Sequence, residues 1–238
     1  MIGNQTGRAT RRLPRRLIQL YVGLALYGVS MAMMIESALG LNPWDVFHQG
    51  LTGLTDLSFG TVTIIVGAAV LLLWIPLRQR PGLGTVSNVI VIGLAVDAAL
   101  ALLPAGQSLP ARLSLLTGGI LLNGVAAGLY LGARFGPGPR DGLMTGFVTR
   151  WPRYSVRLVR TVIEVAVLLI GWLIGGTVGL GTVAYALAIG PLAHLFIPIF
   201  DVAPRTPDGP GPIVADRGPA GVGLTVPGGT PCRRRIRK

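Results

Sequence analysis

Six long apolar segments constrain this sequence more than any other feature. Each is close to the roughly 20 residues that a helix needs to cross the hydrocarbon core of a bilayer. The predicted transmembrane helices cover residues 17–35, 61–77, 85–103, 113–133, 157–175 and 182–200. Charged residues make up only 13% of the chain, against about 25% in soluble proteins. The sequence therefore predicts an all-α membrane protein with six transmembrane helices.

The positions of the arginines predict how these helices are oriented. Arginine-rich segments recur at alternate ends of the predicted helices, at 1–16, 78–80, 134–153 and in the tail after residue 200. The intervening segments are acidic or almost uncharged apart from Arg112, and they cover 36–60, 104–112 and 175–181. Because positively charged loops stay in the cytoplasm, we expect both termini to be cytoplasmic.

The formal net charge of +12 does not predict nucleic-acid binding, because the arginines lie at the ends of apolar segments, where membrane proteins place them. We expect the basic termini to contact anionic lipid headgroups instead. The tail, residues 201–238, is rich in proline and glycine and is predicted to be disordered. The single cysteine, Cys232, excludes a disulfide framework and a cysteine metal cluster.

The sequence also contains an internal repeat. A shift of 96 positions matches Gly40, Pro43 and Asp45 with Gly136, Pro139 and Asp141. A shift of 97 positions matches residues 82–86 with residues 179–183. Each half holds three predicted helices, an odd number, so the second half must enter the membrane from the opposite face. We therefore expect two inverted-topology three-helix repeats, 17–104 and 113–200, an arrangement found in many secondary transporters.

Each half contains one polar elbow between its first two helices. Residues 42–45 have the pattern of a helix start, with asparagine as N-cap, proline first and aspartate third, and residues 138–141 repeat it with glycine as cap. The helix that follows is too short to span, so we expect it to be interfacial or re-entrant. The aspartates either satisfy their own helix starts or belong to gates at opposite membrane faces. The candidate gating residues are Asn42, Pro43, Trp44, Asp45, Pro139, Arg140 and Asp141.

Several polar residues lie inside the predicted spans. Asp97 and His194 occupy equivalent positions, and such groups commonly face a protein interior or a water-filled cavity. A direct pair between the two is disfavoured, because an inverted repeat would place them roughly 10 Å apart in depth. Each could also bond a nearby backbone or hydroxyl group. Arg160 and Glu164 predict an intrahelical ion pair, which could also bind an ion or zwitterion at the mouth of a cavity. We expect Asn88, like Asn123, to hydrogen-bond between helices.

No carboxylate pair, nucleophile–base set or metal-ligand spacing stands out in the sequence. The glycine-rich turns at 82–84 and 179–181 lack the lysine of a phosphate-binding loop. We therefore expect no enzyme activity, no cofactor and no metal.

Five short segments resemble the YczE-type bacterial membrane proteins, which are related to the YitT family. They are Gly-Leu-Asn-Pro-Trp-Asp-Val (40–46), Pro-Gly-Leu-Gly-Thr (81–85), Gly-Pro-Arg-Asp-Gly-Leu-Met (138–144), Arg-Thr-Val-Ile-Glu (160–164) and Gly-Thr-Val-Gly-Leu-Gly-Thr (176–182). The resemblance covers about residues 17–200 and implies a bacterial inner-membrane protein of largely uncharacterised function. It supplies no catalytic residues.

Two functions remain open at this point. One is a small-solute transporter or channel-like protein that works by alternating access on a small molecule or ion. The other is a non-transporting accessory or scaffold protein that acts through partners and lipids. A polar cavity between the two halves would favour the first, and a dry, packed interface would favour the second.

Overall fold

The computed structural model describes residues 6–106 and 108–202, with side chains from residue 13 onward. Within these residues the chain forms eight α-helices and no β-strand, so the all-α prediction is confirmed. The helices are α1 (Thr6–Ser37), α2 (Pro43–Leu54), α3 (Phe59–Leu72), α4 (Leu83–Leu102), α5 (Leu109–Gly132), α6 (Pro139–Arg150), α7 (Val156–Leu173) and α8 (Leu180–Phe200). The prediction of a disordered tail concerns residues that, from 203 on, lie outside this part of the chain.

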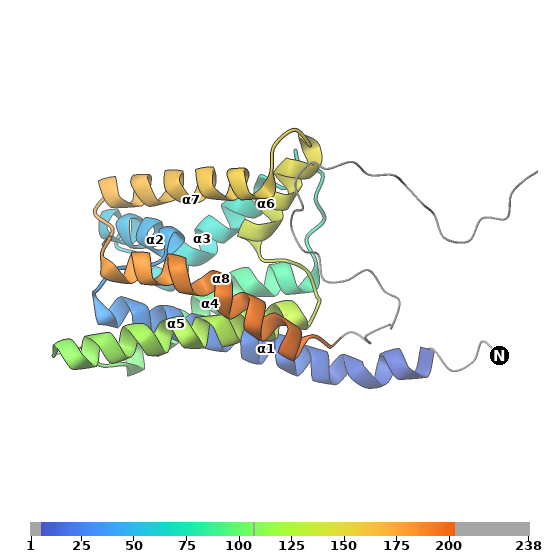
Figure 1. Cartoon of the computed structure of the whole chain (residues 1–238), viewed down its shortest axis with the longest axis horizontal. Helices are drawn as coiled ribbons and strands as arrows, with labels where there is room; N and C mark the ends of the chain where they lie inside the picture. Colours follow the sequence, from blue (N-terminus) through green and yellow to red (C-terminus); the bar gives the residue numbers. More distant parts are fainter. Residues whose placement is uncertain (1–5, 107, 203–238) are drawn as a thin grey trace, which may run out of the picture. The chain divides into compact units, whose positions relative to one another are not determined.

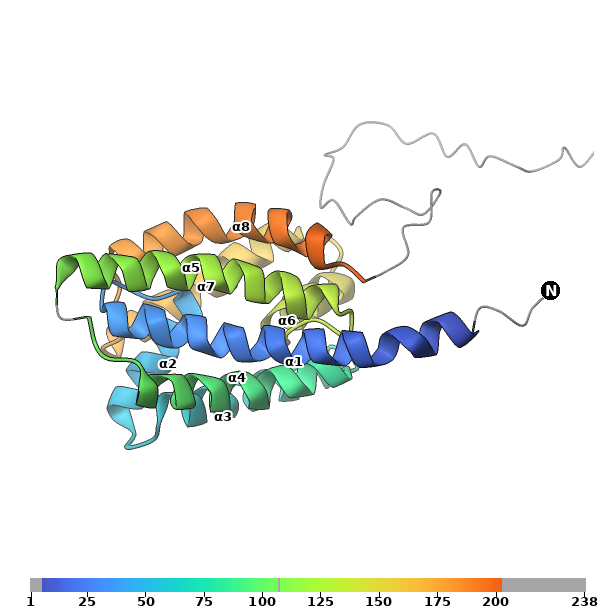
Figure 2. The same ribbon diagram turned by 90° about the horizontal axis from the view of Figure 1, so that it is seen from below.

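The four longest helices, α1, α4, α5 and α8, pack together (Figure 1). Helix α1 contacts both α4 and α5, and α5 contacts α8. Figure 2 shows α1, α4 and α5 side by side. Buried side chains between them include Leu20, Leu24, Met31, Val96 and Tyr130. In a bilayer such helices are held together by close packing and interhelical hydrogen bonds, because lipid tails are as apolar as leucine.

Glycines allow α1 and α5 to approach each other closely. A Cβ atom at Gly23 would lie 3.1 Å from the Ala126 carbonyl oxygen and 2.7 Å from the Tyr130 nitrogen. A Cβ atom at Gly119 would lie 3.1 Å from the Ser30 carbonyl oxygen. Gly119 and Ala126 follow Gly23 and Ser30 by 96 positions, so the two halves make the same contact on each other.

The loops before the two short helices are also equivalent. Gly40 and Gly136 have φ angles of 112° and 118°, a region that favours glycine. Beside Gly40, the Leu39 carbonyl accepts a hydrogen bond from the Gly181 N–H (2.8 Å). Beside Gly136, the Phe135 carbonyl accepts one from the Gly84 N–H (2.9 Å). Each half thus fastens its loop to the start of the last helix of the other half.

The two short helices begin as the elbow sequences predict. The Asn42 side chain caps α2 by accepting a hydrogen bond from the Asp45 N–H (3.0 Å), and Pro43 is the first helical residue. Gly138 is the N-cap of α6, and Pro139 is its first residue. The predicted helix starts are therefore confirmed in both halves.

Two predicted helix boundaries differ from the structure by five residues or more. Helix α1 begins at Thr6 instead of residue 17, because the arginine-rich segment before the apolar run is itself helical, and arginine is a good helix former. Helix α3 ends at Leu72, although the apolar run continues to residue 77. Turns replace the helix there, and the Trp74 indole turns inward to donate to the Pro139 carbonyl (3.0 Å).

Four helical stretches are long and apolar enough to cross a membrane, namely Leu13–Ser37, Leu83–Leu102, Leu109–Gly132 and Leu180–Phe200. Helices α2 and α3, bent by 116° across a short break, raise the number to five if they form one broken span. Helix α7 has only 18 residues and carries Arg157, Arg160 and Glu164. The arrangement with six spans therefore stays a prediction.

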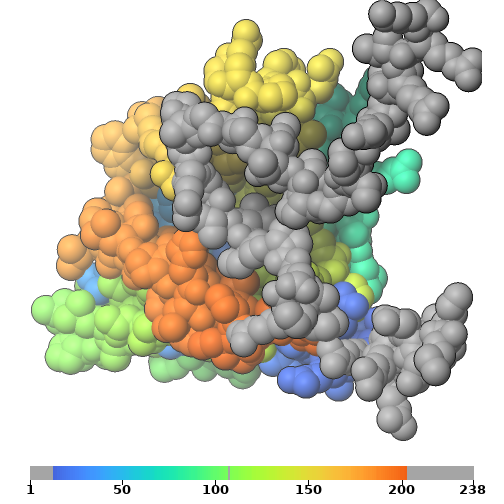
Figure 3. Space-filling model, turned by 45° about the vertical axis from the view of Figure 1, so that its right-hand side comes forward, coloured from blue at the N-terminus to red at the C-terminus, as the bar shows by residue number. Residues whose placement is uncertain are grey.

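The outer faces of the helices are apolar. Helix α8, orange in Figure 3, lies beside the green α5. Large exposed side chains on α8 include Val183, Leu187, Leu195 and Ile199. Similar side chains are exposed on other helices, among them Ile65, Leu94, Leu121, Leu169 and Trp172. Apolar surface on this scale marks contact with a membrane or with other proteins.

Candidate functional site

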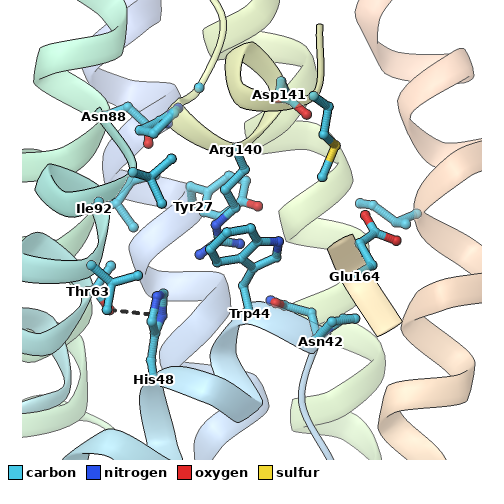
Figure 4. A pocket seen from close by; sticks show the side chains of 18 of the residues that line it. Tyr27, Asn42, Trp44, His48, Thr63, Asn88, Ile92, Arg140, Asp141 and Glu164 are labelled. Atoms are coloured by element: carbon cyan, nitrogen blue, oxygen red, sulfur yellow. Dashed lines mark hydrogen bonds between the residues drawn. The ribbon is translucent and has the colours of Figure 1, made fainter. Parts of the chain in front are cut away.

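A cavity of about 280 Å³ lies where the first turns of α2 and α6 come together. All eight helices contribute to its lining, each with at least one side chain: Tyr27, Trp44, Thr63, Asn88, Tyr130, Arg140, Glu164 and Tyr185. Figure 4 shows Arg140 directly above Trp44, in the middle of the labelled residues. The cavity therefore belongs to both halves of the chain.

The start of α2 holds a buried carboxylate beside the cavity. Asp45 has no exposed surface, and its Oδ2 accepts a short hydrogen bond from the Asn42 side-chain amide. The other oxygen, Oδ1, has no hydrogen-bond partner in the described part of the chain. It lies 3.5 Å from Nδ1 of His48 and 3.6 Å from a guanidinium nitrogen of Arg140. His48 in turn lies 3.3 Å from the Thr63 hydroxyl.

Arg140 connects the two halves at this point. Its guanidinium carbon lies 5.0 Å from the centre of the Trp44 ring, a cation–π distance. Its ion pair with Asp45 is too long for a hydrogen bond. Among the described residues, no hydrogen bond from the Arg140 side chain is found. The five N–H donors of this guanidinium are therefore free to bind an anionic group in the cavity.

Trp44 carries a second donor without a partner. The residue is 7% exposed, and its indole N–H has no hydrogen-bond acceptor among the described residues. Leaving such a group buried and unpaired costs about 1–3 kcal/mol. An unsatisfied donor in a native structure calls for an explanation, and a ligand that supplies the acceptor is one.

Acidic groups line other parts of the cavity. Glu164 on α7 accepts a hydrogen bond from Arg160 (2.9 Å), so the predicted intrahelical pair is present. Asp141 on α6 accepts one from the Tyr130 hydroxyl (3.3 Å). Asn88, which we expected to bond between helices, lines the cavity. The charged groups of the lining are thus two arginines and two carboxylates.

A hydrogen-bond network next to the cavity joins three helices. The Tyr185 hydroxyl on α8 donates to the Asn123 side chain on α5 (3.1 Å). Asn123 donates to the Ser30 hydroxyl on α1 (2.8 Å). The predicted interhelical role of Asn123 is therefore confirmed.

Asp97 and His194 lie outside the cavity lining. The Asp97 carboxylate accepts hydrogen bonds from the Ser58 hydroxyl (2.6 Å) and the Gly60 backbone N–H (2.7 Å), both at the start of α3. His194 is exposed on α8. Neither residue joins the charged groups around Arg140, and Asp97 instead helps to fix the start of α3.

The sequence reasoning missed several lining residues, above all His48 and the tyrosines Tyr27, Tyr130 and Tyr185. His48 follows Asp45 by three positions, a spacing that places both on one face of a helix, so this signal was available. The tyrosines lie in apolar runs where nothing in the local pattern separates a cavity-lining ring from a core ring. Among the described residues, no group of histidine, cysteine, aspartate and glutamate side chains could hold a metal ion.

The apolar helices and the polar cavity they enclose define an integral membrane protein. The chain belongs to the family described as "Family of unknown function (DUF6198)", which matches residues 14–198.

Three relatives cover most of the chain. A protein of Haemophilus influenzae described as "Uncharacterized protein" is 39% identical over 188 residues, 79% of this chain and 86% of the relative. The "Uncharacterized membrane protein YczE" of Bacillus subtilis is 32% identical over 180 residues, 75% of this chain and 83% of the relative. The "Uncharacterized protein YyaS" of the same organism is 24% identical over 184 residues, 76% of this chain and 91% of the relative. The resemblance to YczE-type proteins is thus confirmed, and no solved structure matches.

Proposed function

We propose that this protein is a small-solute transporter or channel-like protein of the bacterial inner membrane that works by alternating access between two inverted repeats. The observation that carries the proposal is the cavity at the first turns of both short helices, with lining residues from both halves. Inverted-repeat transporters bind substrates at the interface between their repeats, where discontinuous helices begin.

In the proposed topology, α1, α3, α4, α5, α7 and α8 cross the membrane, and α2 and α6 are re-entrant. Gly23 and Gly119 make equivalent contacts with the opposite half, as do the loops at Gly40 and Gly136, and this supports two equivalent halves. Helix α7 can cross in spite of its charges because Arg160 and Glu164 are paired and line the cavity. The arginine distribution supports cytoplasmic termini, where the basic tail would contact anionic lipids.

The contacts between helices suggest which parts move. Helix α2 packs on α7, and α6 packs on α3. Each of the two short helices, α2 and α6, therefore packs against a helix of the opposite half. Rocking one half against the other would open the cavity near α2 on one face and near α6 on the other. Arg140, which touches Trp44 and Asp45 across this boundary, would change partners in such a movement.

A scaffold protein would have no use for this cavity. Buried polar and charged groups are costly in a membrane protein and commonly mark a pathway or a binding site. The unpaired donors of Arg140 and Trp44 are of this kind, and they face the boundary between the halves instead of an outer surface. They therefore favour transport over a purely structural role.

The test is solute flux in liposomes that contain the purified full chain. We expect uptake of at least one member of a broad panel of small polar solutes. Arg140→Gln should reduce that flux on the order of tenfold or more, because a hydrogen bond to a charged group contributes about 1.5–3 kcal/mol. Arg153→Gln, which removes an arginine from the loop after α6, is the matched control and should leave flux unchanged. A correctly folded wild-type protein that moves no solute would contradict transport and favour the scaffold.

A further inference from the structure

We infer that the solute is a small zwitterion whose anionic group binds Arg140 and the Trp44 indole N–H, and whose cationic group faces Glu164. The inference deepens the proposed function and rests on it. Two features of the cavity carry it: unused hydrogen-bond donors at one place and an acidic group at another.

The unused donors belong to Arg140 and Trp44. The Arg140 side chain is 26% exposed, and with the described residues it makes only a ring contact and one long ion pair. A planar guanidinium matches the two oxygens of a carboxylate with two parallel hydrogen bonds. The indole N–H of Trp44, buried beside it and without an acceptor, would provide a third. Arg140 and Trp44 therefore suit a carboxylate or a similar flat anion.

The backbone adds to this preference. Arg140 and Trp44 both lie in the first turn of their helices, where free N–H groups and the helix dipole favour negative charge. Asp45 offsets part of the Arg140 charge from behind, but its Oδ1 lies 3.6 Å away and leaves the guanidinium donors unoccupied. A solute anion could thus approach Arg140 from the cavity without first breaking a hydrogen bond.

The acidic group is Glu164. Its side chain is 33% exposed, and the described contacts use only one of its two oxygens, for Arg160. Figure 4 shows Glu164 on the α7 side of the cavity, apart from the central Arg140. The second oxygen of Glu164 is therefore available to an ammonium group whose anionic end lies at Arg140.

The cavity presents charged groups of both signs. Its lining holds two arginines and two carboxylates, and Asp45 lies behind Arg140 at 3.6 Å. A zwitterion can pair with both signs at once, whereas a lone anion or a lone cation pairs with only one of them. The volume of about 280 Å³ lies just below the roughly 300–1,000 Å³ of pockets for drug-sized ligands. A solute with the size of an amino acid fits this space.

The inference can be tested by binding, without transport. The probes are small neutral amino acids and betaine, each next to a carboxylate-only analogue and an amine-only analogue, such as alanine with propionate and alaninamide. We expect at least one zwitterion to raise the Tm of the purified full chain in detergent by several degrees near saturation, and its two analogues to raise it far less. If no zwitterion raises the Tm, or if an amine-only analogue matches its zwitterion, the inference is wrong.

Two substitutions assign the two ends of the solute. Trp44→Phe keeps the ring but removes the N–H, and should weaken binding of the zwitterion and of its carboxylate-only analogue by a similar factor, on the order of tenfold. Glu164→Gln should weaken the zwitterion and the amine-only analogue only. Trp172→Phe, at an exposed tryptophan on α7, is the matched control and should change the binding of no probe.

If Trp44→Phe fails to fold, Arg140→Lys takes its place with the same expected pattern, because it keeps the charge but loses the planar guanidinium. Equal effects on all three probes would overturn the assignment.

Binding and flux separate the two proposals. Zwitterion binding without flux would leave the inference standing and contradict transport. Flux of an ion or uncharged solute, with no zwitterion bound, would support transport and overturn the inference alone.

Discussion

Asp45 depends on its neighbours more than any other carboxylate described here, because it has no contact with solvent. The Asn42 side chain donates a hydrogen bond to the Asp45 carboxylate and also caps α2, the helix that carries Asp45. His48 and Arg140 lie near the remaining oxygen, one on the same helix and one on the opposite half. A buried charge of this kind is strongly destabilising once a partner is removed.

Asn42→Ala should therefore destabilise the protein more than an ordinary cap substitution does. Losing the cap costs about 0.5–2 kcal/mol, and an unsatisfied buried group adds about 1–3 kcal/mol. We expect the Tm in detergent to fall by roughly 5–15 °C, at about 2–4 °C per kcal/mol for a chain of this size. Ser155→Ala removes the exposed cap of α7 and is the matched control. Equal shifts for both variants would contradict the role given to Asn42.

Asp97→Asn should affect stability but not solute handling. The carboxylate receives hydrogen bonds from Ser58 and Gly60 and lies outside the cavity. Replacing a charge-assisted hydrogen bond by a neutral one costs on the order of 1 kcal/mol. We expect a small loss of Tm with flux per folded molecule unchanged. A large loss of flux at normal stability would show that Asp97 lies on the solute pathway after all.

Part of the cavity lining could be predicted from the sequence, because repeated motifs mark positions that a fold uses twice. Prolines and aspartates in the two elbows identified the first turns of α2 and α6, and the spacing of Arg160 and Glu164 identified their pair. The meeting of Trp44 with Arg140 could not be predicted, since it depends on how two distant loops face each other. Asp97 was ambiguous because a capping carboxylate and a cavity carboxylate look alike in an apolar run.

At the scale of helices, close packing of α1 on α5 holds the halves together. The two helices approach so closely at these glycines that no side chain fits between them, and this is clearest at Gly23. A glycine inside a helix otherwise lowers its stability by about 1 kcal/mol relative to alanine. Its presence in α1 is therefore explained by the neighbouring helix and not by α1 itself.

Gly23→Ala should destabilise the protein even though alanine is the better helix former. Its Cβ would lie 2.7 Å from the Tyr130 nitrogen, so the helices must move apart, at a cost of about 1–3 kcal/mol. Gly53→Ala is the matched control, because nothing lies within 4 Å of the added atom. Thermal unfolding should show a lower Tm for the first variant and an unchanged or higher Tm for the second. The opposite order would contradict close packing at Gly23.

Helix positions were predicted well where apolar runs and caps coincide, as in α4 and α8. The second predicted span was too long, because apolar composition continues past Leu72 while the hydrogen bonds change to turns. Composition reports where a segment can be buried, but the Trp74 hydrogen bond to Pro139 depends on a distant part of the chain. Local patterns carry no information about such a contact.

For the molecule as a whole, the two halves repeat their helices, their loops and their contacts with each other. The order of a long, a short, a medium and a long helix occurs twice. Equivalent hydrogen bonds fasten Leu39 to Gly181 and Phe135 to Gly84. A repeat that holds the opposite half in this reciprocal way suits movement of two rigid halves around one cavity.

The proposed topology predicts which loops are accessible from outside the cell. In a Cys232→Ser background, single cysteines at Ser108 and Val178 should react with an impermeant maleimide on intact cells. Cysteines at Gln79 and Arg153 should react only after the membrane is made permeable. Val178 and Arg153 lie at opposite ends of α7, so labelling of both from the same side would show that α7 does not cross and would contradict six spans.

Trp44 and Arg140 occupy the same position in their respective halves, 96 residues apart, and yet they touch. If two identical short chains formed the same assembly, this position would bring together two tryptophans or two arginines. Two arginines would repel each other, and two tryptophans would carry no charge. Joining both halves in one chain allows the position to hold one of each. The proposed solute, whose two ends differ in charge, then has a single orientation in the cavity. A symmetric dimer could not provide a site with two different ends.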